Sequence, residues 1–186
     1  MTESVEIWVV ALDQPDHELE RLYSLLSREE RRRAGAPPFP PRKRRYVARQ
    51  GALREILARY AAVPPQRLEL VRSNRGKPMV AGAGSLRFSV SDSADLALVA
   101  VARREVGVDV EQVRRRTAST RAALGTEAFF ERWTRLEATG KALGTGLLRP
   151  RGADGGLACA SLDLGPGFAG AVAVAADQVE VQLRPY

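Results

Sequence analysis

Two acidic side chains stand two residues apart in the segment 106–111, where Asp109 and Glu111 alternate with valines. In a β-strand these side chains would project from one face, about 7 Å apart along the chain. Carboxylates that close repel each other unless a positive charge lies between them. Magnesium prefers oxygen ligands and completes its shell with water and substrate phosphates. The pattern predicts a divalent-metal site, although an exposed strand with both carboxylates in water has the same pattern.

A third carboxylate lies in a predicted helix over 127–143, where Trp133, Glu137 and Lys141 follow one another at intervals of four. Residues at this spacing share one face of a helix. A Glu–Lys pair of this kind is commonly a surface ion pair worth about 0.2–0.5 kcal/mol. The indole in line with the pair instead indicates a partly buried stripe, where charged groups need partners. Asp109, Glu111 and Glu137 are therefore the predicted metal ligands.

Both segments belong to a longer ordered series of motifs that covers most of the chain. In order the motifs are VEIWVVALD, LSREERRRA, RRYVARQGALREILARY, RGKPMV at 75–80, LRFSVSDSADLALVAVA, VGVDVEQVR and FFERWTRLEATGKALGTGL. This series resembles the signatures of the phosphopantetheinyl transferase superfamily, in its larger, surfactin-type form. No one of these motifs is specific, but their number and order make a chance match improbable.

The resemblance implies an α+β fold with two pseudo-twofold halves, here 1–103 and 104–186, and an active-site cleft between them. It implies Mg²⁺-dependent transfer of the 4′-phosphopantetheine arm of coenzyme A to a serine of an acyl or peptidyl carrier protein. The implied roles are as follows: Asp109, Glu111 and Glu137 bind Mg²⁺; Lys141 contacts phosphate; Arg45, Arg54 and Lys77 bind the nucleotide end; Ser91 lies beside the phosphates; and Glu137 deprotonates the carrier serine.

Three features depart from the pattern of the superfamily. Asp92 replaces a histidine between two serines, and an ionised aspartate accepts hydrogen bonds but cannot donate one to a phosphate. Leu136 replaces a lysine just before Glu137, which removes a cation and makes that edge of the cleft more apolar. The connection 112–126, which usually helps to receive the carrier protein, is shortened.

These departures leave two alternatives to the transferase reaction. In the first, the same cleft serves another enzyme of secondary-metabolite biosynthesis. That enzyme would act on an uncharged small molecule, with an acid or base drawn from Asp92, Asp109, Glu111 and Glu137. In the second, the chain binds coenzyme A or a carrier protein without catalysis.

The elements that must position these residues follow from hydrophobic periodicity and turn signals. Helices are predicted over 16–34, 42–62 and 127–143, the first with a break at Ser27, which forms a capping box with Glu30. Strands are predicted over 5–12, 67–71, 86–90, 96–102, 106–111, 157–164, 168–176 and 179–184. Helices and strands that occur in blocks indicate α+β, with helices packed on antiparallel sheets.

The composition of the chain bears on its partners and its cellular compartment. The net charge of +7 comes mainly from arginine, whose planar fork suits phosphate, although a coding bias toward arginine would give the same excess. The sequence argues against a nucleic-acid partner, because no aromatic stacking motif accompanies the arginines. No stretch approaches the roughly 20 apolar residues of a membrane span. With one cysteine, Cys159, and no secretory signal pattern, we expect a cytoplasmic protein.

Overall fold

Helices and strands alternate in blocks in a computed structural model, which describes residues 1–113, 120–145 and 156–186, without the side chains of 120–126. The helices are α1 (Asp16–Ser24), α2 (Arg28–Ala34), α3 (Pro41–Ala61), the short 3-10 helix η1 (Pro65–Arg67) and α4 (Thr120–Leu143). The strands are β1 (Thr2–Ala11), β2 (Leu70–Arg72), β3 (Pro78–Val80), β4 (Arg87–Ser93), β5 (Leu96–Ala102), β6 (Val106–Gln112), β7 (Ala158–Leu162), β8 (Phe168–Val174) and β9 (Gln178–Pro185).

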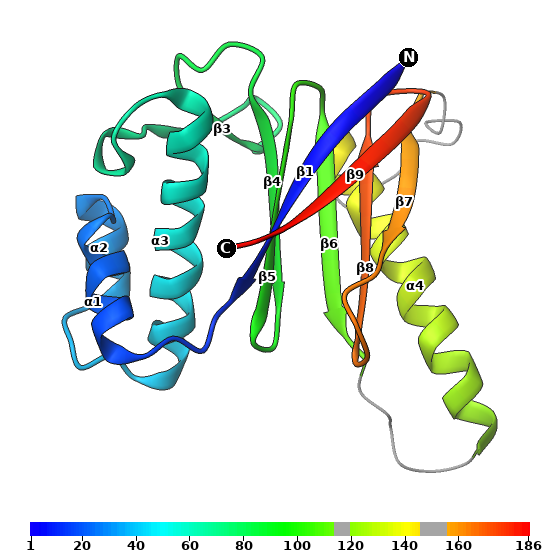
Figure 1. Ribbon diagram of the computed structural model, residues 1–186, viewed down its shortest axis with the longest axis horizontal. Coiled ribbons are helices and arrows are strands. Elements are labelled where there is room, and N and C mark those ends of the chain that lie inside the picture. The colour runs from blue at the N-terminus through cyan, green and yellow to red at the C-terminus, as the bar shows by residue number, and fades with distance from the viewer. Residues whose placement is uncertain (114–119, 146–155) are drawn as a thin grey trace.

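The elements stack as helices, sheet, sheet and helix (Figure 1). One sheet has the strand order β4-β5-β1-β9 and the other β6-β8-β7, while β2 and β3 form a separate hairpin. Apolar side chains fill the space between α1–α3 and the first sheet, and between the two sheets. The fold is α+β, as predicted, and the strand pairs in the described residues are antiparallel except for β1 with β9.

The predicted break in the first helix is confirmed. The Ser27 side chain accepts a hydrogen bond from the Glu30 backbone, and the Glu30 side chain accepts one from the Ser27 backbone, so α2 starts with a complete capping box. The two short helices pack beside α3, which carries the buried residues Leu53, Ile56 and Leu57 toward the first sheet.

Several predicted elements differ from the observed ones at their ends, and β3 was not among the predicted strands. Pro65–Arg67 forms a 3-10 turn, so β2 begins at Leu70 rather than at residue 67. Helix α4 begins at Thr120, seven residues before the predicted start at 127, in a stretch whose composition lacks an apolar stripe. None of the helices in the described ranges is long and apolar enough to cross a membrane.

Helix α4 lies unusually close to the second sheet because both surfaces are built from small residues. Ala138 and Ala142 of the helix pack on Ala171 and Ala173 of β8. At Gly107 of β6 an added Cβ would lie 2.0 Å from the Ala138 carbonyl oxygen and 2.5 Å from the Ala142 nitrogen. This contact sets how near the side chains of α4 come to those of β6.

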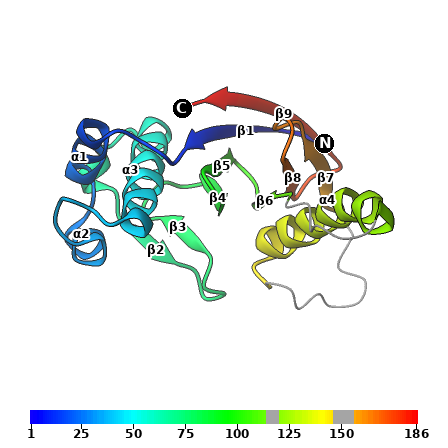
Figure 2. The ribbon, with the colours of Figure 1, turned by 90° about the horizontal axis from the view of Figure 1, so that it is seen from below.

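The two halves of the chain are connected by the loop between β5 and β6 and also by the pairing of β9 with β1. The predicted boundary at residues 103 and 104 falls in the short connection between β5 and β6. Strand β9, however, runs parallel to β1 with eight paired positions, from Thr2–Gln178 to Val9–Pro185, so the last strand belongs to the sheet of the N-terminal half. Figure 2 shows β9 crossing beside β1 from the side of β7 and β8. The division into 1–103 and 104–186 stays a prediction.

Replacing Gly107 by alanine tests the close contact between α4 and β6. The new methyl group would meet backbone atoms rather than flexible side chains, so the helix has to shift. We expect a loss of about 1–3 kcal/mol in the free energy of unfolding, as is usual for overpacked cores, with a larger loss for Gly107→Val. Urea denaturation measures it, and wild-type stability in both variants would contradict the packing described.

Candidate functional site

The joint between β4 and β6 places the candidate site. These two strands are edges of different sheets and share no main-chain ladder. Instead, the hydroxyls of Ser89, Ser91 and Ser93 accept hydrogen bonds from three β6 backbone N–H groups. The pairs are Ser89 with Val108 at 3.1 Å, Ser91 with Val110 at 3.4 Å, and Ser93 with Gln112 at 3.0 Å. The N–H groups lie in the plane of their sheet, so β6 presents its edge to one face of β4.

Asp109 and Lys141 form an ion pair at the centre of this joint. The Lys141 Nζ lies 2.7 Å from Asp109 Oδ1, 2.9 Å from Ser91 Oγ and 3.2 Å from the Val108 carbonyl oxygen. Ser91 Oγ donates to the same Asp109 oxygen at 2.8 Å. The Asp109 side chain is 6% exposed and that of Lys141 31%. Strand β6 and helix α4 therefore bring these two predicted site residues together.

Glu111 projects from the same face of β6 as Asp109, as the alternation predicted. Its Oε2 accepts a hydrogen bond of 3.0 Å from Ser93 Oγ. Glu137 lies one turn before Lys141 on α4, and Trp133, Glu137 and Lys141 are all half-buried, which confirms the predicted partly buried stripe. Within the described part of the chain Glu137 has no hydrogen-bond or ion-pair partner.

The predicted metal trio is only partly assembled. Among residues 1–113, 120–145 and 156–186, no group of three or more Asp, Glu, His or Cys side chains is placed to hold a metal ion. Asp109 Oδ2 nevertheless is buried and lacks a hydrogen-bond partner among the described residues, and a buried unpaired carboxylate oxygen is costly. This oxygen, next to Glu111 on the same face, fits a hard cation bound through one or two carboxylates. The trio itself stays a prediction.

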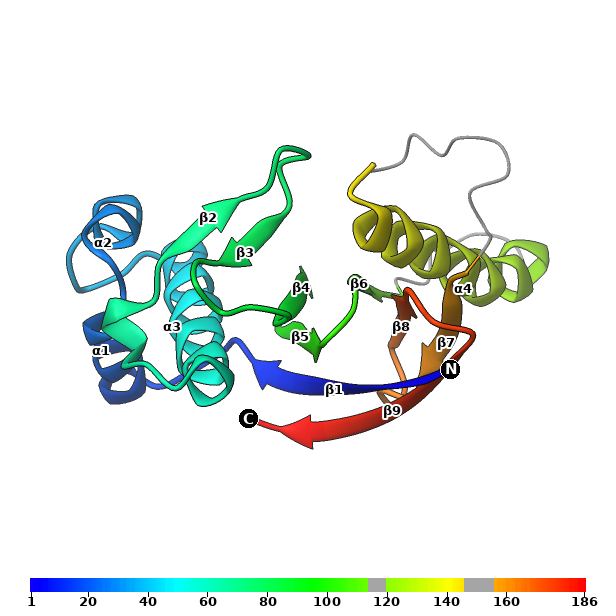
Figure 3. The same ribbon diagram turned by 90° about the horizontal axis from the view of Figure 1, so that it is seen from above.

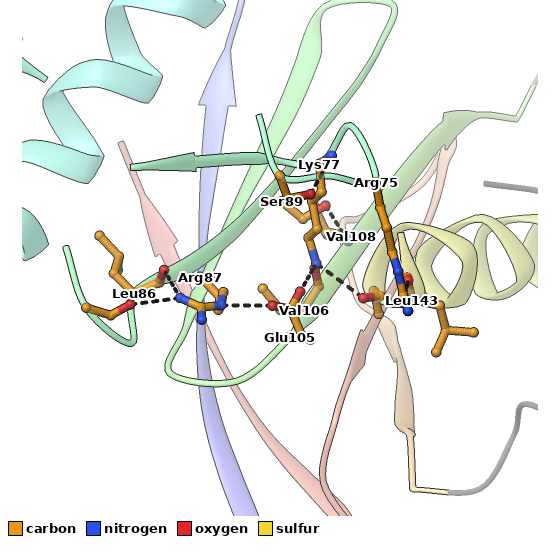
Figure 4. Close-up of polar contacts among 12 residues, drawn as sticks. Arg75, Lys77, Leu86, Arg87, Ser89, Glu105, Val106, Val108 and Leu143 are labelled. Atoms are coloured by element: carbon orange, nitrogen blue, oxygen red, sulfur yellow. Dashed lines mark hydrogen bonds and ion pairs between the residues drawn. The ribbon is translucent and has the colours of Figure 1, made fainter. Parts of the chain in front are cut away.

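Lys77 connects the β2–β3 hairpin with the second half of the chain (Figure 4). Its Nζ donates to Glu105 Oε2 at 2.7 Å, to the Val106 carbonyl at 2.9 Å and to the Ala142 carbonyl at 3.3 Å. Burial lowers the pKa of this amino group, against the opposing effect of Glu105. Here the lysine holds the end of α4 against β6. Its contact with the nucleotide stays a prediction, and its three observed acceptors belong to the protein itself.

A cavity of about 280 Å³ opens between the hairpin and α4, beside Lys141. Its lining includes Arg75, Pro78, Phe88 and Lys141. Arg75 donates to the Leu143 carbonyl at 3.2 Å, so the tip of the hairpin meets the C-terminal end of α4, and Figure 3 shows this approach. The cavity is polar at Arg75 and Lys141 and apolar at Phe88, which suits part of a phosphorylated ligand.

Asp92 points away from the serine joint because side chains alternate along β4. Its Oδ1 pairs with Arg49 Nη1 at 2.8 Å, on the side of α3. One turn earlier, Arg45 binds Asp13 and the Ala94 carbonyl, and hydrogen bonding to Arg45 lowers the pKa of Asp13. The predicted site residues Arg45 and Asp92 thus lie near the turn between β4 and β5. Arg49, which the sequence did not single out, partly neutralises Asp92.

Arg54 lies apart from the other predicted site residues, in the interior of the N-terminal half. Its side chain is 3% exposed, and its donors reach Glu30 Oε2 and the carbonyls of Pro65 and Leu68. The role of Arg54 in nucleotide binding stays a prediction. In the structure its guanidinium joins α2, α3 and η1.

Sequence reasoning named Ser91 as a site residue but missed that Ser89, Ser91 and Ser93 together join β4 to β6. Serines at 89, 91 and 93 repeat with the period of a strand, and this signal is present in the motif FSVSDS.

Of the three departures from the superfamily pattern, Leu136 is 40% exposed on α4 beside Phe129 and Trp133. Residues 114–119 of the shortened connection, and the end of the last motif at 146 and 147, lie outside the described residues.

Comparison with curated proteins gives the relatives of this chain. It is 33% identical over 171 residues to the 4′-phosphopantetheinyl transferase HetI of Nostoc sp., a match that covers 80% of this chain and 72% of the relative. The chain belongs to the phosphopantetheinyl transferase superfamily. No model in a scan of protein families matches it.

Two further superfamily relatives match over similar parts of the chain. A putative 4′-phosphopantetheinyl transferase of Synechocystis sp. is 28% identical, over 76% of this chain and 65% of its own length. A phosphopantetheinyl transferase of Thraustochytrium sp. is 31% identical, over 78% of this chain and 55% of its own length. The superfamily consists of transferases, and this superfamily member spans between about half and three quarters of these relatives.

The contribution of the Glu30–Arg54 ion pair to the stability of this superfamily member can be tested through its dependence on pH. Burial raises the pKa of Glu30, but bonds from Arg54, the Ser27 backbone and Gln50 outweigh it and hold the pKa below the ordinary 4.5. The stabilisation is therefore complete above pH 4.5 and is lost as the pH falls through the lowered value. We expect Glu30→Gln to cost about 3–5 kcal/mol at pH 7, because it breaks a buried pair.

Denaturation of both forms between pH 3 and pH 7 measures the effect. The difference between wild type and Glu30→Gln should shrink toward the acid end. Glu29→Gln is the matched control, since Glu29 is exposed and its pair with Arg33 is worth about 0–1 kcal/mol. Equal losses in the two variants would show that the pair does not hold α2 to α3.

Proposed function

We propose that this chain transfers the 4′-phosphopantetheine arm of coenzyme A to a serine hydroxyl of an acyl or peptidyl carrier protein, with Mg²⁺ at Asp109 and Glu111. The observation that carries the proposal is the buried, unpaired Asp109 Oδ2 beside the ammonium group of Lys141. A cation site next to a fixed positive charge suits a pyrophosphate, because phosphoryl-type transfer depends mainly on positioning and charge neutralisation.

Each of the nearby residues has a role in this reaction. Lys141 provides positive charge at the phosphates, and the cavity between the hairpin and α4 takes part of the donor. A bound Mg²⁺ supplies charge neutralisation at the pyrophosphate oxygens. Glu137, which is half-buried on the same stripe as Lys141, accepts the proton of the carrier serine.

The transfer is balanced in bonds and protons. The serine oxygen attacks the phosphorus that carries the pantetheine arm, and the bond from that phosphorus to the nucleotide phosphate oxygen breaks. The arm is left as a phosphodiester on the serine, and the nucleotide leaves as adenosine 3′,5′-bisphosphate. The serine proton passes to Glu137, directly or through water.

The donor's nucleotide end is assigned to the surface near Arg45 and Arg49. Both arginines are already paired with carboxylates, Arg45 with Asp13 and Arg49 with Asp92. These pairs are partly exposed, so a phosphate can compete for the guanidinium groups at little cost. Asp92 therefore weakens donor binding without removing the cations that it needs.

Mass spectrometry of an apo carrier protein, incubated with this chain, coenzyme A and Mg²⁺, tests the reaction. We expect the carrier to gain the mass of the arm, and Glu137→Gln to lower kcat by about 100- to 10,000-fold, the usual contribution of a general base. Glu131→Gln is the matched control, because Glu131 is an exposed carboxylate on the same helix.

Three outcomes would contradict the proposal in different ways. Calorimetric binding of coenzyme A without transfer to several carriers would identify a binder without catalysis. Failure to bind coenzyme A, with folding confirmed, would indicate that the cleft acts on another small molecule. Equal loss of activity in Glu137→Gln and Glu131→Gln would remove Glu137 from the mechanism.

Replacing Asp92 by asparagine tests the surface assigned to the nucleotide. The change removes a negative charge and frees Arg49, so we expect coenzyme A to bind several-fold more tightly at low salt, equivalent to about 1 kcal/mol. The gain should fall as salt screens the charges. Titration calorimetry measures it, with Asp163→Asn, a change at an exposed carboxylate in the loop after β7, as the charge-matched control. Equal gains in both variants would point to net charge alone.

A further inference from the structure

We propose that Ser91 and Ser93 are positioning residues that fix the metal-binding carboxylates, each serine leaving one oxygen of its carboxylate free for the cation. The inference rests on the proposed function, since it concerns the same Mg²⁺ site. It differs from the role that resemblance gave Ser91, which was to lie beside the phosphates.

The direction of each hydroxyl bond follows from the chemistry of its partners. A backbone N–H can only donate, so Ser91 Oγ accepts from Val110 and Ser93 Oγ accepts from Gln112. Each hydroxyl still has its own proton to donate, and the acceptor within reach is a carboxylate of β6. Ser91 donates to Asp109 at 2.8 Å, and Ser93 donates to Glu111 at 3.0 Å. Strand β6 thereby fixes the serine that in turn fixes its own carboxylate.

The arrangement leaves the other oxygen of each carboxylate unused. Asp109 Oδ1 accepts hydrogen bonds from Ser91 and Lys141, while Oδ2 is buried and has no hydrogen-bond partner in the part of the chain that the structure describes. Glu111 Oε2 takes Ser93, and within the described ranges Glu111 makes no other hydrogen bond or ion pair. A carboxylate that is already hydrogen-bonded at one oxygen loses little conformational freedom when its other oxygen binds a cation. Hydrogen-bonded partners of metal ligands typically contribute 10- to 100-fold to metal affinity.

Ser89 offers an internal control for this role. It makes the same bond to β6, from the Val108 N–H at 3.1 Å, and it is as buried as Ser91. The β6 residue that Ser89 faces carries no carboxylate, because the residue in register with Asp109 and Glu111 is Gly107. Ser89→Ala therefore removes one bridge between the halves without removing a carboxylate contact.

The experiment is a titration of the full chain with Mn²⁺, as a paramagnetic substitute for Mg²⁺, by electron paramagnetic resonance. Wild type, Ser89→Ala, Ser91→Ala and Ser93→Ala are compared with and without coenzyme A. We expect the metal dissociation constant to rise about 10- to 100-fold for Ser91→Ala and Ser93→Ala. For Ser89→Ala, whose side chain also lines the cavity assigned to the donor, we expect a change of less than about threefold in the titration without coenzyme A. Ser93→Thr, which keeps the hydroxyl at a half-buried position, should restore the affinity.

The outcomes separate this inference from the function on which it rests. Wild-type metal affinity in folded Ser91→Ala and Ser93→Ala, or an equal loss in Ser89→Ala, would overturn the positioning role and leave the transferase proposal standing. Absence of metal binding by the wild type, with coenzyme A present, would overturn the Mg²⁺ assignment and the positioning role together. Unfolding curves recorded on the same samples confirm that each variant is folded.

Discussion

The side-on contact of β6 with β4 is the constraint on which the rest of the site depends. Two sheet edges meet there, and exposed edges are surfaces that proteins ordinarily have to cover. Three serine hydroxyls take the place of a main-chain ladder, and two of them also bind a carboxylate. The same bonds therefore join the halves of the chain and orient its acidic side chains. At Ser91 and Ser93 the joint between β4 and β6 and the orientation of the carboxylates therefore depend on the same hydroxyl.

Helix α4 completes the site only because it can come close to β6. Small residues on both surfaces, with Gly107 at the nearest point, let Lys141 reach Asp109. Lys77 then holds the end of the helix through the Ala142 carbonyl. At Asp109 the two oxygens have different surroundings, since Lys141 and Ser91 share Oδ1 and Oδ2 stays unpaired. A lysine and a cation can therefore lie on the same carboxylate without excluding each other.

Local patterns in the sequence predicted most elements and part of the site. The capping box at Ser27, the strand alternation at Asp109 and Glu111, and the stripe through Glu137 and Lys141 each follow from interactions within a few residues, and the structure agrees with them. Side-chain pairing across the fold could not be predicted in this way. Nothing near Arg54 in the sequence indicates that Glu30 would hold it in the interior.

The same limit applies to charges on the surface and to strand order. The partner of Asp92 is Arg49, 43 residues away, and the distance in sequence hides this pair from any local pattern. The segment 179–184 was recognised as a strand, but its parallel pairing with β1 depends on the whole topology. The departures from the superfamily pattern can be read from the sequence. Their physical effects depend on neighbouring residues that only the fold brings together.

The pairing of β9 with β1 has a consequence for how the chain folds. Strand β1 has β5 on one side, and its other side pairs with a strand that follows about 170 residues later in the chain. Contacts of such long sequence separation slow folding, because the loop must close before they form. The β1 edge of the first sheet stays open until β9 has been made. Truncation just before residue 178 would remove β9 and leave that edge exposed, and so prone to self-association.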